Sequence, residues 1–299
     1  QTVERDGERI DVCIACHGVH LAPDAPPRQA GANGKGLQMS EFDVGTPHIV
    51  LEKEGPILWC RIDRPRNKNA FTPAMYFGIK RAVRIVNELK EPTAMILTGT
   101  GDSFSAGGDL GGRYEEGEQP AHHGLTYEML PFIAIRESMA PVISAVNGIC
   151  QGGGLLCAMM SDIAVVSDRS TFRVPELLRG IIDATYAAIL PAHVGMAMAR
   201  DLILSCRKID AAEAYRIGLV SRMVPHDQLR EEAVKAACEI LRTAPEARAH
   251  SKRMLNHQYA TIDYETMFAS LMYGSEPREG MAAFMEKREP NWIPKNLPA

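Results

Sequence analysis

The sequence predicts a fold of the α/β class, and three observations lead to that class. A buried strand, a glycine-rich loop and the start of a helix follow one another twice in the middle of the chain. From about residue 193 onward the apolar residues recur mostly at helical spacing. The 299 residues are 45% hydrophobic and 23% charged, which is the composition of an ordinary globular protein.

Charge and composition exclude several classes of partner. The formal net charge of −4 and the lack of a Lys/Arg-rich block argue against nucleic acid as a partner. No uninterrupted apolar stretch is long enough to cross a bilayer, and no secretory signal is recognisable. We therefore expect a cytoplasmic protein without a membrane partner. Seven cysteines, mostly in apolar runs, indicate reduced thiols.

Residues 1–40 differ from the rest, because they are polar, rich in Gly, Pro and Ala, and hardly periodic. They are predicted to form a flexible N-terminal extension. Within them, Cys13-Ile14-Ala15-Cys16-His17 has the spacing of a c-type haem attachment site. About twenty residues on each side are too few to wrap a haem. The segment is therefore interpreted as an appendage, with haem attachment, a zinc site or a redox role as the alternatives.

The first regular elements begin at residue 48. Two apolar runs around Gly55-Pro56 predict a hairpin over residues 48–63. A helix follows over residues 72–92, with Thr72 as its N-cap, Pro73 in its first turn and Pro92 closing it. Residues 93–99 predict a buried strand.

The repeated pattern occupies the middle of the chain. Residues 100–112 predict a glycine-rich loop, and a helix is expected near residues 126–139. A second buried strand over residues 141–148 precedes the loop Gln151-Gly-Gly-Gly and an apolar helix. A third strand is predicted over residues 162–168.

Two glycine loops in matching positions suggest a shared chemical role. Glycine lets backbone N–H groups approach a ligand, and N–H groups at a helix N-terminus have no intrahelical partner. Two such loops can form an oxyanion hole around one carbonyl oxygen. Three other motifs fit the residues poorly. A phosphate-binding loop needs a lysine that follows neither loop, a dinucleotide fingerprint needs glycine where Cys157 stands, and GDSFS lacks the final glycine of a nucleophile elbow. Tight strand–helix packing alone is the structural alternative.

Five successive segments together resemble the signatures of the crotonase superfamily, the enoyl-CoA hydratase/isomerase group. They are SFSAGGDL (103–110), PVISAVNGICQGGG (141–154), VPELLRGI (174–181), AAEAYRIGLVSRMVP (211–225) and REGMAAFMEKREP (278–290). The resemblance covers about residues 47–292. It implies a spiral core of ββα units with an acyl-CoA site over residues 41–225. It also implies a helical oligomerisation region over residues 226–299, which forms a homotrimer or hexamer.

The resemblance further implies which residues bind an acyl-CoA thioester. The oxyanion hole falls on the N–H groups of Gly108 and Gly153, and Asp109 matches a residue that caps a short helix. Residues matched to CoA contacts are Arg66, Lys68, Ala70, Ala106, Asp109, Leu110 and Lys287. For the basic residues near position 66, a solvated turn is the alternative. No cofactor is expected beyond the CoA of the substrate. No metal is expected, because the adjacent His122 and His123 have no evident carboxylate partner.

The acid–base groups depart from the family pattern. Hydratases of the family carry two glutamates, and here Leu156 stands at the first position while Glu176 occupies the second. Glu176 is the expected proton-transfer group, with a surface ion pair to Arg173 or Arg179 as the alternative. Asp183 is either a second acid/base group across the pocket or the cap of the following helix.

These observations leave the expected reaction partly open. The chain is expected to be an enzyme that stabilises a thioester enolate and moves a proton with Glu176, in isomerisation or hydration of an enoyl-CoA. A single carboxyl makes isomerisation the simpler chemistry. The alternative is a non-catalytic acyl-CoA-binding homologue that has lost one acid at Leu156.

Overall fold

The computed structural model describes residues 42–294, apart from 92, 112–117 and 119–129, and also the backbone of three short strands before residue 21. The chain divides into two units, Gln1–Gln38 and Met39–Ala299. In the first unit, β1 (Thr2–Arg5), β2 (Glu8–Cys13) and β3 (Gly18–His20) form an antiparallel sheet. The flexibility predicted for residues 1–40 stays a prediction. Residues 14–17 of the Cys-x-x-Cys-His segment lie outside the described residues.

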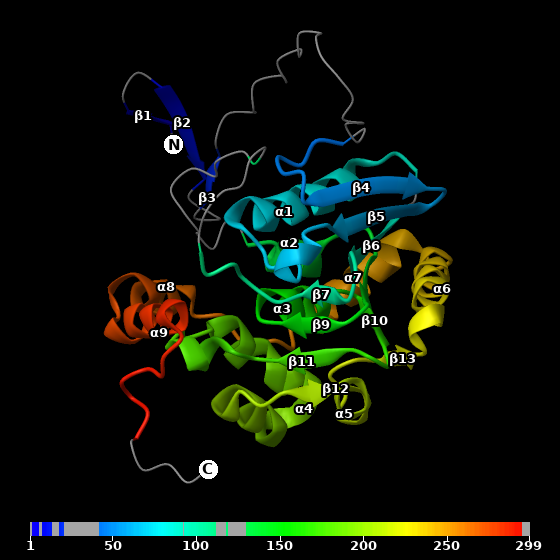
Figure 1. Ribbon diagram of the computed structural model, residues 1–299. Coiled ribbons are helices and arrows are strands. Elements are labelled where there is room, and N and C mark those ends of the chain that lie inside the picture. Colours follow the sequence, from blue (N-terminus) through cyan, green and yellow to red (C-terminus); the bar gives the residue numbers. More distant parts are fainter. Residues whose placement is uncertain are drawn as a thin grey trace, which may run out of the picture. The chain divides into compact units, whose positions relative to one another are not determined.

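The second unit is built around two sheets (Figure 1). The larger sheet has the order β13-β10-β8-β6-β5-β4, parallel throughout except for the antiparallel pair of β4 with β5. The smaller sheet has the order β12-β11-β9-β7. The strands are β4 (Ile49–Glu54), β5 (Ile57–Ile62), β6 (Ala94–Gly99), β7 (Ser103–Ser105), β8 (Val142–Val146), β9 (Ile149–Gln151), β10 (Ile163–Ser167), β11 (Thr171–Arg173), β12 (Ile209–Asp210) and β13 (Arg222–Val224).

Successive segments of chain supply one strand to each sheet in turn. The pairs β6–β7, β8–β9 and β10–β11 each cross from the larger sheet to the smaller one. This arrangement confirms the predicted α/β class and the repeated unit. Strand β7, however, lies inside the stretch predicted as an uninterrupted loop over residues 100–112. Its three residues, two of them serines, are too few and too polar to produce a recognisable strand pattern.

Helices follow the strands. They are α1 (Pro73–Glu88), α2 (Phe132–Glu137), α3 (Gly153–Met160), α4 (Ala184–Ser205), α5 (Ala211–Arg216), α6 (Leu229–Leu241), α7 (Pro245–Asn256), α8 (Tyr264–Tyr273) and α9 (Ser275–Glu286), with the short 3-10 turns η1 (Pro65–Asn67), η3 (Glu176–Arg179) and η4 (His226–Gln228). Thr72 caps α1 as predicted, since its hydroxyl accepts the N–H of Met75 at 3.2 Å. Helix α2 is shorter than the predicted 126–139, although residues 126–129 lie outside the described residues.

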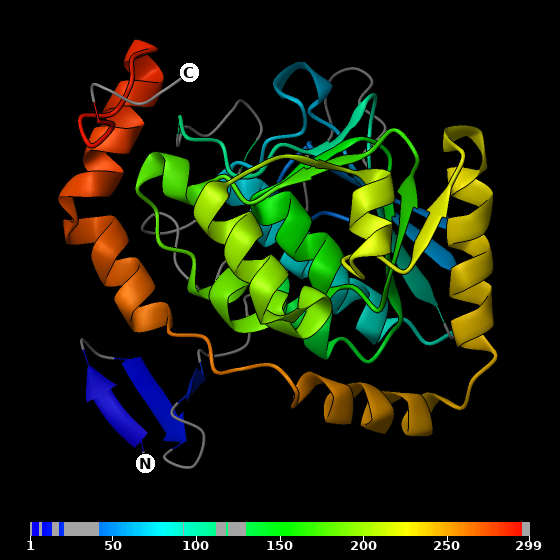
Figure 2. The same cartoon turned by 90° about the horizontal axis from the view of Figure 1, so that it is seen from below.

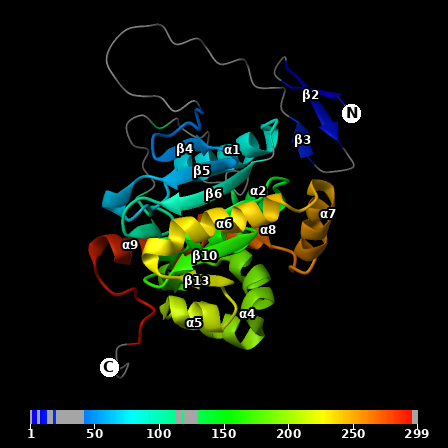
Figure 3. The same cartoon turned by 90° about the vertical axis from the view of Figure 1, so that its right-hand side faces the viewer.

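The central strands β6 and β8 of the larger sheet are buried on both faces. In β6, Met95 and Leu97 face the main core, whereas Ala94 and Ile96 face a second apolar cluster. Helix α6 covers that second face, as Figure 3 shows, and it does so with small side chains. Because successive side chains of such a strand point into two different apolar clusters, every position is apolar, and the strand appears in the sequence as a continuous apolar run.

Helix α4 is long and apolar enough to cross a membrane, by length and composition alone. It bends at Gly195, where φ is 76° and ψ is 157°. Its first half buries Tyr186, Ile189 and Leu190 in the main core. A core helix of a globular protein passes the same test, so the finding is weak support for a membrane span.

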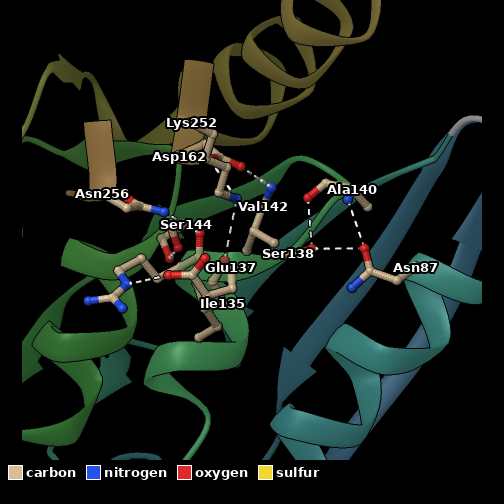
Figure 4. Close-up of polar contacts among 12 residues, drawn as sticks. Asn87, Ile135, Glu137, Ser138, Ala140, Val142, Ser144, Asp162, Lys252 and Asn256 are labelled. Carbon is tan, nitrogen blue, oxygen red and sulfur yellow. Dashed lines mark hydrogen bonds and ion pairs between the residues drawn. The ribbon is translucent and has the colours of Figure 1, made fainter. Parts of the chain in front are cut away.

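Helix α7 is attached to the core by polar contacts, which Figure 4 shows in close-up. The Lys252 ammonium pairs with Asp162 Oδ1 at 2.8 Å, and Asp162 Oδ2 accepts the N–H of Val142 at 2.8 Å. Asn256 Nδ2 donates to the carbonyl of Arg136 at 3.0 Å. The contacts therefore join α7 to the ends of α2 and β8.

We expect Lys252→Met to lower the free energy of unfolding by about 1–3 kcal/mol, because the largely buried Asp162 carboxylate would lose its charged partner. The two side chains are only 14% and 18% exposed. Urea unfolding monitored by circular dichroism measures the change. Lys235→Met is the control, since it breaks an exposed pair with Glu232 and should cost less than about 1 kcal/mol. Equal losses of unfolding free energy in both variants would show that the Lys252–Asp162 pair stabilises the fold no more than an exposed ion pair does.

Candidate active site

The two glycine loops lie against each other. The first follows β7 and the second follows β9, and these two strands pair in parallel. A Cβ built on Gly107 would lie 3.3 Å from the Cα of Gly152 and 3.5 Å from the N of Gly153. The repeat seen in the sequence therefore brings both loops to one place.

Within these loops, the N–H groups of Gly108 and Gly153 are the ones predicted to form the oxyanion hole. The N–H groups of Ala106, Gly107 and Asp109 donate to Lys68 O, Ser105 Oγ and Phe71 O, respectively. That of Gly152 donates to the carbonyl of Arg173. Across the part of the chain that the structure describes, no hydrogen bond is donated by the N–H of Gly108 or Gly153.

Local geometry explains why glycines occupy the second loop. Gly152 precedes α3 with φ 54° and ψ −133°, a conformation that side chains disfavour. A Cβ on Gly153 would lie 2.2 Å from the Tyr76 hydroxyl and 3.0 Å from two ring carbons of that tyrosine. No larger residue fits at position 153 unless Tyr76 moves.

The carboxyl of Glu176 faces the same loop. A Cβ on Gly152 would lie 3.1 Å from Glu176 Oε1. Oε2 of Glu176 is buried, and none of the residues that the structure describes forms a hydrogen bond with it. Burial, followed by the charge of Asp183, raises the pKa of Glu176 well above its usual value. Such a group holds a proton near neutrality more readily than an exposed glutamate does.

The predicted alternative for Glu176, a surface ion pair, is not what the structure shows. Arg173 Nε donates to the carbonyl of Cys206 at 2.6 Å. The Arg179 guanidinium lies 4.4 Å from the centre of the Phe284 ring. Neither arginine forms an ion pair with Glu176 within the described chain. A buried carboxylate oxygen without a partner, as Oε2 is, costs the fold stability, so a functional role is the better explanation.

Asp183 is the N-cap of α4. Its Oδ1 accepts the N–H groups of Thr185 at 2.8 Å and Tyr186 at 3.2 Å. Burial raises its pKa, and these hydrogen bonds oppose the shift. Asp183 is connected to the second loop through Tyr186, whose N–H it accepts and whose hydroxyl donates to the Gly152 carbonyl. Capping is therefore observed, and it is compatible with a second role in proton transfer.

Tyr76 and Tyr186 belong to this site, and sequence reasoning missed both. Tyr186 donates its hydroxyl to the carbonyl of Gly152 at 2.7 Å, which fixes the second loop. Tyr76 precedes Ile79 by three residues and so lies on the buried face of α1. A buried tyrosine in an apolar stripe is the available signal, because its hydroxyl needs a partner.

Leu156 is buried in α3 and is 2% exposed. Every residue of α3 is buried, so this helix presents only apolar side chains and backbone to its surroundings. The position at which family hydratases carry their first glutamate therefore has no acid or base in this chain. Among the described residues, Glu176 is the carboxyl that lies against Gly152 of the second loop.

Several residues predicted to bind CoA lie on one turn beside the first loop. Arg66 and Lys68 are exposed, and Ala70 is half-buried. The Lys68 carbonyl accepts the N–H of Ala106, which ties this turn to the glycine loop. Buried Asn69, which the sequence analysis missed, holds the turn through Nδ2 bonds to Thr100 and Ser103 carbonyls, and its φ of 56° is tolerated by asparagine.

The remaining predicted CoA contacts are more scattered. Asp109 pairs with the buried Arg64 at 2.7 Å and accepts the N–H of Gly111, which supports the structural role predicted for it. Leu110 is half-buried beside it. Lys287 is exposed at the end of α9. No hydrogen bond or ion pair among the described residues connects Lys287 with the turn at residues 65–70.

Helix α9 packs directly on η3, the turn that carries Glu176 (Figure 2). A Cβ on Gly280 would lie 2.3 Å from the carbonyl oxygen of Arg179. A Cβ on Gly180 would lie 2.6 Å from the carbonyl of Glu276. The two glycines thus permit a backbone-to-backbone contact that positions η3.

No group of three or more His, Cys, Asp or Glu residues in the described chain is arranged to hold a metal ion. The described cysteines are Cys60, Cys150, Cys157, Cys206 and Cys238, and all are free thiols, as predicted for them.

Two sheets with unpaired glycine N–H groups beside a buried carboxyl oxygen form the arrangement expected of an α/β enzyme that stabilises an oxyanion with its backbone. Residues 52–295 match the family model described as enoyl-CoA hydratase/isomerase. The chain belongs to this family, which confirms the predicted resemblance and the crotonase-like fold.

Individual relatives agree with this assignment. The chain is 35% identical over 267 residues to the mevalonyl-coenzyme A hydratase sidH of Aspergillus fumigatus, covering 84% of this chain and 94% of that one. It is 35% identical over 256 residues to the crotonyl-CoA hydratase of Syntrophomonas wolfei, covering 83% and 98%. The crystal structure of an enoyl-CoA hydratase/isomerase from Pseudoalteromonas atlantica superposes with a TM-score of 0.71 at 30% identity, covering 82% and 100%.

Proposed function

We propose that this enzyme moves a double bond in an enoyl-CoA, with Glu176 as the group that carries the proton. The observation that supports this most directly is the buried, unpartnered Oε2 of Glu176 beside two free glycine N–H groups. Only one of the two family glutamates is present, because Leu156 replaces the other. A proton shift needs one carboxyl, and Asp183 is a second one, connected to the same loop through Tyr186.

The proposed steps balance without any cofactor beyond the CoA of the substrate. The Glu176 carboxylate takes a proton from C2 of a 3-enoyl-CoA, and the C–H electron pair moves toward the thioester oxygen. The N–H groups of Gly108 and Gly153 stabilise the resulting dienolate. The same proton, or one relayed through Asp183, is then delivered to C4, and a 2-enoyl-CoA is formed.

Hydration is the second candidate, and the names of the two relatives support it. In that reaction Glu176 would activate a water molecule and return its proton to C2. Without a carboxyl at Leu156, a single residue must then perform both steps.

The two reactions are separated by incubating the enzyme with a 3-enoyl-CoA and, in parallel, with crotonyl-CoA. Isomerisation produces conjugated enoyl absorbance from the first substrate, whereas hydration removes it from the second and yields a 3-hydroxyacyl-CoA. We expect the first substrate to be turned over faster. If both thioesters bind and neither is converted, the chain is the non-catalytic acyl-CoA-binding homologue.

We also propose how the substrate and neighbouring subunits bind. The exposed cations Arg66, Lys68 and Lys287 are offered as contacts to CoA phosphates. A homotrimer or hexamer would cover the exposed apolar side chains of α7, α8 and α9. These are Met254, Leu255, Met272, Tyr273, Phe284 and Met285. Size-exclusion chromatography with light scattering tests the assembly.

A further inference from the structure

The hydroxyl of Tyr76 lies between the two glycine loops. Its oxygen is 2.2 Å from where a Cβ would stand on Gly153 and 3.2 Å from where one would stand on Gly108. Apart from the two chain neighbours of Gly108, no other residue of the described chain lies within 4 Å of the position that a Cβ on Gly108 would take. The hydroxyl is thus next to the same two residues whose N–H groups are unpaired.

The ring of Tyr76 is held in place by aromatic neighbours. The Phe71 ring meets it edge-on at a centroid distance of 4.9 Å, and the Phe132 ring does so at 6.1 Å. Phe71 itself bridges to Gly108 through backbone hydrogen bonds on either side of that glycine. Only 6% of Tyr76 is exposed. The hydroxyl is therefore fixed by packing rather than by a polar contact.

Tyr76 offers a proton and has no protein acceptor for it. Among the described residues, its hydroxyl takes part in no hydrogen bond. Burial, with the charges of Cys157, Glu176 and Asp183 adding to it in that order, holds the pKa of Tyr76 well above its usual value. The group remains a neutral O–H donor across the working pH range. The ring is buried, but its hydroxyl is not one of the fully buried, unpartnered polar atoms of the described chain, so a ligand acceptor can reach it.

We propose that Tyr76 is a further catalytic residue, whose hydroxyl donates a third hydrogen bond to the thioester oxygen beside the N–H groups of Gly108 and Gly153. The inference rests on the proposed function, because it needs an acyl-CoA carbonyl at this place. A side-chain donor of this kind strengthens as charge develops on the oxygen. The carboxyls of the pocket disfavour a negatively charged enolate. The hydrogen bond from Tyr76 would offset part of that unfavourable effect.

The test measures carbonyl polarisation directly. A dienoyl-CoA, whose absorption band moves to longer wavelength as its carbonyl is polarised, is bound to the Glu176→Gln protein, in which turnover is blocked. The same measurement is made on the Glu176→Gln/Tyr76→Phe double variant. We expect the second protein to show a smaller band shift at saturation. In the Glu176-containing enzyme, Tyr76→Phe should lower kcat about tenfold to a hundredfold while KM changes less than about threefold.

Tyr259→Phe is the matched control, because it removes another partly buried tyrosine hydroxyl, one that bonds His193 at 3.1 Å. It should leave both the band shift and kcat unchanged. A full band shift in the double variant would overturn the role of Tyr76 and leave the proposed function intact. If the Glu176→Gln parent binds the dienoyl-CoA without any shift, the oxyanion site and the Tyr76 inference both fail. Thermal melts of all variants check that the fold is retained.

Discussion

Replacing Gly153 with alanine is expected to lower kcat at least about a hundredfold, the size of effect produced by losing one oxyanion donor. The added Cβ would stand 2.2 Å from the Tyr76 hydroxyl, which real contacts do not allow. Either the tyrosine or the loop must move, and both carry groups assigned to the thioester oxygen. Steady-state turnover of a 3-enoyl-CoA measures the loss.

Gly108→Ala is the informative comparison for that variant. Beyond its chain neighbours, its Cβ would meet only Tyr76 among the described residues, at 3.2 Å from the hydroxyl and 4.0 Å from a ring carbon, so a small adjustment accommodates it. We expect it to retain much more activity than Gly153→Ala. Similar losses in both variants would refute the steric explanation, and full activity in Gly153→Ala would remove residue 153 from the site.

Glu176→Gln is expected to lower turnover about a hundredfold to ten-thousandfold, the usual contribution of a general acid or base. Affinity for CoA thioesters should change little, since no predicted CoA contact is altered. Calorimetric titration with a CoA thioester and steady-state kinetics measure the two quantities separately. An unchanged turnover would exclude Glu176 as the proton carrier.

The same variant is expected to be more stable than the parent at neutral pH. Burial raises the pKa of Glu176 above the ordinary 4.5, so the folded state holds the proton more tightly than the unfolded chain does. The stability that this proton confers is present below about 4.5 and is lost as the pH rises toward the folded-state pKa. The melting temperature of Glu176→Gln should therefore exceed that of the parent by a margin that increases as the pH rises.

Asp183→Asn separates the two roles open to Asp183. Asparagine is as good an N-cap as aspartate, so α4 should be preserved. A fall in the turnover of a 3-enoyl-CoA at unchanged stability would indicate proton transfer. Wild-type activity would leave Asp183 as a cap alone.

Much of the fold could be predicted because its signals are local. The hairpin of β4 and β5, the Thr72 cap and the buried strands β6, β8 and β10 all follow from short-range apolar patterns and turn residues. Strand β7 was missed because its pairing with β9 is a long-range contact between three-residue segments. Such pairing leaves no periodic trace in the sequence.

The candidate site was predictable in part. Motif spacing pointed to Gly108, Gly153 and Glu176, and the structure brings their loops together. Tyr76 and Tyr186 were not identified, since a tyrosine in an apolar stripe resembles any core residue until its hydroxyl is located. Their roles depend on which backbone atoms lie opposite, and only the tertiary structure determines that.

The contact of Gly280 with the Arg179 carbonyl has a consequence for biosynthesis. The turn bearing Glu176 acquires its last neighbour only after residues 275–286 have been translated. A nascent chain halted before that point can have both sheets in place and still lack the support beneath its reactive carboxyl. Ribosome-bound intermediates should therefore form the two sheets before they become catalytically competent.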